Sequence, residues 1–124
     1  MRLTRLWTLV VVAASITAAS AHHSPAVFDL GRQITVEGVV SEFRWTNPHS
    51  WIELAVTADD GTTTAWSIEM NGPAHLVRAG WRRSTIAPGD AVTIVANPLR
   101  TDDAIGKFVS VVLPNGERMT ERAP

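Results

Sequence analysis

The chain lacks cysteine and tyrosine entirely, and Lys107 is its only lysine. Without cysteine, no disulfide and no thiolate metal site can hold the domain, so a hydrophobic core must supply its stability. The formal charges nearly balance, with 11 basic and 12 acidic residues and no basic run. Because a clustered basic patch is the electrostatic signature of nucleic-acid binding, the sequence predicts no nucleic-acid partner.

The chain also lacks an apolar run of the ~20 residues that a membrane-spanning helix needs. Its N-terminus has the layout of an export signal, with two arginines before an uncharged apolar stretch over 6–16 and small residues ending in Ala19-Ser20-Ala21. That ending is the A-x-A pattern of a signal-peptidase site. We therefore expect residues 1–21 to be removed and the mature protein to be periplasmic or secreted, without membrane association. Its net charge would be −3, because nine basic residues remain against 12 acidic ones.

Cleavage after Ala21 would make His22 the first mature residue and His23 the second. An N-terminal histidine offers its free α-amine and its imidazole, and the Irving–Williams order favours Cu(II) on such nitrogen ligands. A cut after Ala19 would place His22 third, where the amine, two backbone amides and the imidazole can also bind Cu(II). Either cut therefore predicts a copper chelate at the N-terminus.

A third nitrogen ligand can come from His49, which lies in a turn over 46–50. Pro48 stiffens this turn because it restricts the residue before it to an extended conformation, and a rigid support suits a ligand residue. His22 and His49 together would give a T-shaped nitrogen set. His23 is the weaker candidate, since adjacent side chains on an extended arm point apart. The alternative interpretation is that His49 only hydrogen-bonds within its turn.

Alternating apolar positions and turn signals predict five strands behind an arm at 22–31, which Val27 and Phe28 can pin to the body. The predicted strands cover 33–45, 51–56, 65–70, 91–96 and 108–113. A change of apolar phase near Gly38 predicts a bulge or a bend in the first strand. The last strand is apolar on both faces, so we expect it to be central or covered.

Between the third and fourth strands, Pro73 and Gly80 bound a helix of about two turns. Leu76 and Val77 are expected to face inward, and His75 is expected at the surface. The order of elements, with a long bent first strand, predicts an all-β fold with one short helix: a five-stranded OB-fold-like Greek-key barrel. A small β-sandwich is the alternative. The barrel should cover residues 32–116 and be followed by a flexible tail at 117–124.

Four segments of the sequence resemble a known family. They are Ala21-His22-His23-Ser24, Phe43-Arg44-Trp45-Thr46-Asn47-Pro48-His49-Ser50-Trp51, Trp66-Ser67-Ile68-Glu69-Met70 and Pro88-Gly89-Asp90. With them the chain resembles domain-of-unknown-function family 6152, a bacterial family of small exported proteins, over nearly its whole mature length. The resemblance implies export and a single small β-barrel domain. It implies no established activity.

Two tryptophans, Trp45 and Trp51, flank the turn that contains Asn47. Because OB-folds bind ligands on their second and third strands and the adjacent loops, these three residues are candidates for an aromatic ligand site. The alternative is that the tryptophans belong to the core. Trp66 is in phase with Ile68 and is expected to be buried.

Glu53 and Glu69 lie on the polar phase of neighbouring predicted strands. Paired carboxylates can do acid–base chemistry, but the alternative interpretation is a solvated strand face. No serine has an evident base and orienting acid, and no catalytic motif is present, so we name no catalytic residue.

Two classes of function remain. One is an exported protein that binds copper through His22 and His49. The other is an OB-fold interaction module without metal, which would bind a periplasmic protein, a peptide, a sugar or another small ligand through its loops and tryptophans.

Overall fold

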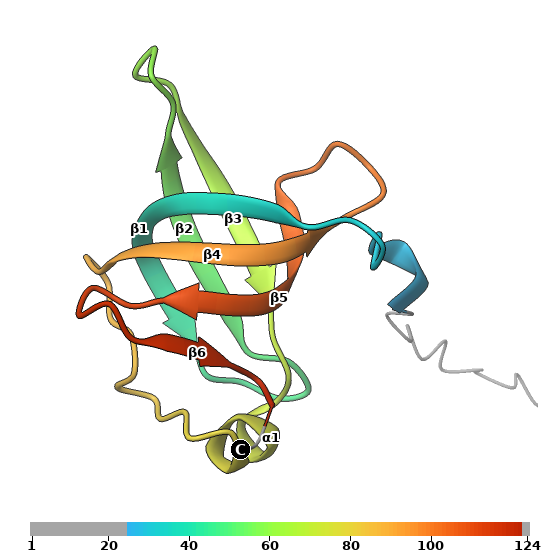
Figure 1. Ribbon diagram of the computed structural model, residues 1–124, viewed down its shortest axis with the longest axis vertical. Coiled ribbons are helices and arrows are strands. Elements are labelled where there is room, and N and C mark those ends of the chain that lie inside the picture. Colours follow the sequence, from blue (N-terminus) through green and yellow to red (C-terminus); the bar gives the residue numbers. More distant parts are fainter. Residues whose placement is uncertain (1–24, 123–124) are drawn as a thin grey trace, which may run out of the picture.

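The computed structural model describes residues 25–122, which contain six strands and one short α-helix (Figure 1). In chain order they are a 3-10 turn η1 (Pro25–Val27), β1 (Ile34–Arg44), β2 (Trp51–Thr57), β3 (Thr63–Glu69), α1 (Pro73–Arg78), β4 (Ala91–Pro98), β5 (Ile105–Val112) and β6 (Arg118–Thr120). Within the described residues, no helix is long and apolar enough to cross a membrane.

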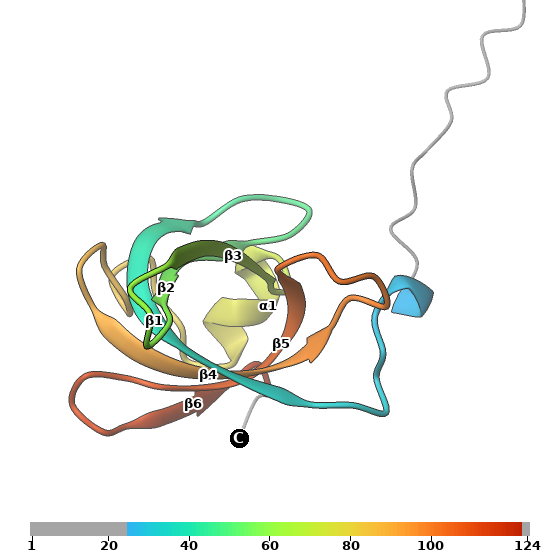
Figure 2. The ribbon, with the colours of Figure 1, turned by 90° about the horizontal axis from the view of Figure 1, so that it is seen from above.

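The first five strands close into a barrel. The sheet has the order β3-β2-β1-β4-β5-β6, and an additional parallel pairing joins β3 to β5. This closure, with α1 between β3 and β4, is the OB-type topology that the sequence predicts, so the five-stranded barrel is confirmed in place of the β-sandwich. Figure 2 looks along the barrel and shows α1 across its far end.

The long strand β1 bends so that its first half pairs with β4 and its second half with β2. The register with β2 shifts between Val40 and Glu42, which confirms the predicted bulge. At Gly38, a Cβ atom would lie 2.8 Å from the carbonyl oxygen of Ala55. The close approach of β1 to β2 therefore requires a residue without a side chain at this position.

The hydrophobic core fills the barrel and extends to the end that α1 covers. Its largest fully buried side chains are Trp81, Ile52, Leu54, Ile68, Met70, Leu76 and Ile94. Trp81 follows α1 and is 1% exposed. Its ring packs edge-on against Phe108, with the ring centroids 5.5 Å apart, and its Nε1 donates to the carbonyl oxygen of Thr120 at 2.8 Å. Trp81 thus closes this end of the barrel.

Two expectations about burial were wrong. Trp66 is only partly buried, because it lines an open pocket with Ile34 and Asp103. On α1, Leu76 is fully buried but Val77 is exposed, since a helix of six residues meets the barrel along a single narrow stripe.

Residues 117–124 were expected to form a flexible tail, but β6 lies within this segment and pairs with β5. Met119 of β6 packs against the core. After the strand, Glu121 accepts hydrogen bonds from the backbone N–H of Asn71 at 2.5 Å and from its side-chain Nδ2 at 2.8 Å. A strand of three residues is too short to show the alternation of apolar and polar side chains by which strands are recognised. The sequence pattern therefore predicts a loop at this segment.

Candidate functional site

A row of polar and aromatic side chains crosses the outside of the barrel. Arg44 of β1 pairs in register with Trp51 of β2, Trp51 pairs with Glu69 of β3, and Glu69 pairs with Lys107 of β5. Residues that pair directly across strands point to the same face of a sheet. These four residues therefore share the outer face, while neighbours such as Ile52 fill the core.

Glu69 is the buried member of this row, with only 7% of its side chain exposed. Its Oε1 lies 3.3 Å from the Nζ of Lys107, which donates a hydrogen bond, and 3.4 Å from the Nδ1 of His49. The interpretation of this strand face as solvated is therefore wrong at Glu69, which lines a pocket together with residues of the N-terminal arm and the β4–β5 connection. An ionised carboxylate away from water needs partners, and the neighbouring Lys107 and His49 supply them.

His49 sits in the β1–β2 connection with one ring nitrogen fixed. Its Nδ1 lies 3.0 Å from the carbonyl oxygen of Met70, and a carbonyl can only accept, so Nδ1 carries the proton. Its Nε2 has no hydrogen-bond partner within residues 25–122, and the side chain is 32% exposed. The backbone around it is held because Thr46 Oγ1 donates to the carbonyl oxygen of His49 at 2.8 Å and Met70 N–H donates to that of Ser50 at 2.8 Å.

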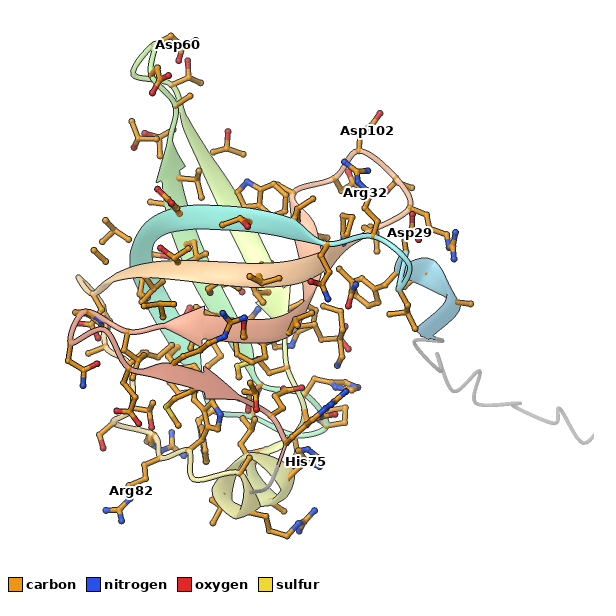
Figure 3. The ribbon with its side chains drawn as sticks, in the orientation of Figure 1. Asp29, Arg32, Asp60, His75, Arg82 and Asp102 are labelled. Carbon is orange, nitrogen blue, oxygen red and sulfur yellow. The ribbon has the colours of Figure 1, made fainter. Side chains whose placement is uncertain are left out.

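The N-terminal arm is attached to the β4–β5 connection. Phe28 is buried and forms an isolated β-bridge with Leu99. The backbone N–H of Arg100 donates to the carbonyl oxygen of Val27 at 2.9 Å, and its Nε donates to that of Ala26 at 2.9 Å. Figure 3 shows Asp29 and Arg32 of the arm on the same side of the barrel as Asp102 of this connection, away from His75 and Arg82 near α1.

A pocket of about 450 Å³ lies where the arm, the β4–β5 connection and the outer row meet. Phe28, Leu99 and Ile105 supply apolar walls, and Trp51 and Glu69 of the outer row complete the lining. Arg44 lies over the Trp51 ring, 5.5 Å from its centroid. Glu53, next along β2, pairs with Arg44 and accepts a hydrogen bond from Ser67 Oγ at 2.5 Å.

The structure brings some predicted site residues together and separates others. His49 and Trp51 both adjoin Glu69. Trp45 instead packs edge-on against Phe43, with the ring centroids 5.6 Å apart, and lines a different pocket beside Trp81. Asn47 is exposed in the β1–β2 connection. His22 and His23 lie outside the described residues. Among the described residues, no group of three or more His, Asp or Glu side chains is placed to hold a metal ion.

A second polar cluster adjoins the first through Glu121. Burial raises the pKa of this carboxyl group above its ordinary value of 4.5, and the hydrogen bond from Asn71 and the charges of Lys107, His75 and His49 partly oppose that shift. His75 is exposed, as expected, and its Nε2 lies 2.7 Å from the carbonyl oxygen of Glu121. Sequence patterns did not single out Glu121 or Lys107, because neither belongs to a motif.

Comparison with known proteins places the chain in one family and finds structural neighbours. A family model described as "Family of unknown function (DUF6152)" matches residues 9–108, and no curated protein matches the chain. Five solved chains match. One is a mitochondrial single-stranded DNA binding protein of S. cerevisiae, with 15% sequence identity and a TM-score of 0.49, covering 66% of this chain and 93% of that chain.

The exclusion of nucleic acid that was drawn from the charge pattern is withdrawn beside this match to a single-stranded DNA binding protein. Charge counting alone was an unsafe basis for that exclusion, since single strands are also bound by stacking on aromatic side chains. At this identity and TM-score, the likeness assigns no ligand to the present chain.

Proposed function

The chain belongs to the family of unknown function DUF6152, and on that premise we propose that it is an exported copper-binding protein. In this proposal His22 becomes the N-terminal residue and chelates Cu(II) through its α-amine and imidazole. His49 supplies the third nitrogen through Nε2. His23 is the weaker candidate ligand, because adjacent side chains on an extended arm point apart.

The observation that carries the proposal is the geometry of His49. Its Nδ1 is held by the Met70 carbonyl oxygen at 3.0 Å and faces Glu69, while Nε2 has no partner among the described residues. Histidine ligands of metals characteristically donate their other ring N–H to a carbonyl or carboxylate, which fixes the ring and raises its basicity. His49 is therefore oriented as a metal ligand would be.

The anchored arm supports the second half of the proposal. Val27 lines the same pocket as Glu69, and Glu69 adjoins His49. His22 lies five residues before Val27, and five extended residues span at most roughly 16–18 Å. The attachment of residues 26–28 to the β4–β5 connection thus holds this part of the arm close to the face that carries His49.

The test is Cu(II) calorimetry on protein whose N-terminus has been verified by mass spectrometry. His49→Ala should weaken binding at least tenfold, and one residue added before His22 should weaken it more. His75→Ala is the matched control, since His75 is exposed and distant from the arm, and it should bind as the wild type does. Affinity should fall below about pH 6.5, because amine and imidazole bind only when deprotonated.

An unchanged affinity in the protein that combines His49→Ala with the added residue would reject the copper site. Mass spectrometry of exported material that began at Ser20 would reject the version with His22 as N-terminal ligand. Retention of the uncleaved chain in the membrane would reject export as a free protein.

The second candidate function is an interaction module that binds a protein, peptide or sugar without metal. The observation in its favour is Trp51, which lies on the outer face of β2 beside the β4–β5 connection, where OB-folds bind their ligands. Trp45 and Asn47 were the other candidates for this role. Replacement of Trp51 by alanine would abolish ligand capture by such a module and leave Cu(II) binding unchanged.

A further inference from the structure

The pocket beside the N-terminal arm has the dimensions and walls of a small-molecule site. Its volume of about 450 Å³ falls within the ~300–1,000 Å³ that is usual for ligand pockets. Phe28, Leu99 and Ile105 give it apolar walls, and Trp51 adds an aromatic one. Such walls bury the apolar body of a ligand but do not by themselves choose its charge.

The charge selection comes from Glu69. Its side chain is 7% exposed, and both of its close neighbours, Lys107 Nζ and His49 Nδ1, approach the same oxygen, Oε1. No residue in 25–122 donates a hydrogen bond to Oε2. Among the described residues, no side-chain oxygen that is cut off from solvent lacks a partner, so Oε2 is accessible from outside, and a ligand that brings a donor can form a charge-assisted hydrogen bond with it.

The other charged groups at the pocket favour a cation. Asp103 lines it and adds a second negative charge. Arg100 also lines it, but its Nε donates to the Ala26 carbonyl oxygen at 2.9 Å and holds the arm. Lys107 is paired with Oε1 and is not part of the lining.

We propose that this pocket binds a small organic ammonium ion with an apolar body. The ammonium group donates to Glu69 Oε2, and the apolar body lies against Phe28, Leu99 and Ile105. Because hydrogen bonds to a charged acceptor are stronger than those to a neutral one, an amine should be preferred over the alcohol of the same shape. A carboxylate of the same shape should be rejected by Glu69. This site needs no copper and stands independently of the proposed metal function.

Benzylammonium is a suitable probe, with benzyl alcohol and benzoate as its neutral and anionic counterparts. Calorimetric titrations of the mature protein with EDTA present keep copper out of the measurement. We expect saturable binding of benzylammonium at least tenfold tighter than that of benzyl alcohol, and no binding of benzoate. Glu69→Gln should weaken benzylammonium binding about tenfold or more. Glu53→Gln is the matched control, because Glu53 lies on the same strand face outside the pocket, and it should leave binding unchanged.

A second variant keeps the test decisive if Glu69→Gln unfolds. Val27 is 42% exposed, so Val27→Trp can fill the pocket from its rim without disturbing the core, and it should abolish binding. Equal affinities for the amine and the alcohol, or unaltered benzylammonium binding in both variants, would overturn the proposal. Failure to detect any saturable binding of benzylammonium would overturn it as well, whatever the protein does with Cu(II).

Discussion

Replacement of Trp81 by alanine should destabilise the barrel more than any other single truncation of a tryptophan in the described residues. The side chain is 1% exposed, and its ring centroid lies 5.5 Å from that of Phe108 and 6.1 Å from that of Phe43. Its indole N–H donates to the carbonyl oxygen of Thr120 at 2.8 Å. Alanine would leave a cavity at the end of the barrel that α1 covers and would remove the hydrogen bond that joins Trp81 to the end of β6.

The magnitude follows from these contacts. Truncation of a buried tryptophan costs about 3–5 kcal/mol through lost transfer free energy and the cavity, and the lost hydrogen bond adds about 1 kcal/mol. The sum, about 4–6 kcal/mol, is a large part of the ~5–15 kcal/mol that stabilises a small domain. Trp81→Phe keeps an aromatic ring but loses part of the buried volume and the N–H donor, so it should cost about 1–3 kcal/mol.

Urea unfolding followed by far-UV circular dichroism measures these free energies without depending on tryptophan fluorescence. Trp66→Ala is the control, since Trp66 is only partly buried. Because this ring removes less apolar area from water, its truncation should cost about 1–2 kcal/mol less than that of Trp81. The reasoning is refuted if Trp66→Ala destabilises the domain more than Trp81→Ala. It is equally refuted if Trp81→Ala costs less than about 1 kcal/mol, which is the range of surface substitutions.

Local sequence patterns were enough to predict the barrel strands, because each strand carries its own apolar period and ends at a turn. The first strand was expected at 33–45 and forms as Ile34–Arg44. The last barrel strand was expected to start at Phe108, yet β5 begins at Ile105. Gly106 and Lys107 interrupt its apolar pattern, and they pair with β3 on one side and with β4 on the other, which are long-range contacts that a local pattern does not contain.

The site was less predictable for the same reason. His49 stands out in the sequence, because histidine beside proline in a turn is a recognisable signal. Glu69 does not, because an alternating strand pattern predicts which face a side chain occupies and not what covers that face. Phe28 and Leu99 line a pocket with it although both are distant from it in the sequence, and Lys107 reaches it only because the barrel closes between β3 and β5.

Two further predictions test the backbone and the electrostatics. Gly38→Ala should cost about 1–3 kcal/mol in urea unfolding, the range for overpacking, because its Cβ would lie 2.8 Å from the Ala55 carbonyl oxygen. The control is Gly31→Ala, whose Cβ would meet nothing closer than 3.6 Å and which should be nearly neutral. Equal costs for the two variants would contradict the argument. Burial raises the pKa of Glu121 above 4.5, so the folded state binds this proton more tightly than the unfolded state does. Its contribution to stability is therefore present at pH values below 4.5 and is lost as the pH rises through the folded pKa. The free energy of unfolding of the wild type minus that of Glu121→Gln should accordingly decrease between pH 4 and pH 7, and a difference that stayed constant or increased would show that Glu121 is not held in a desolvated position.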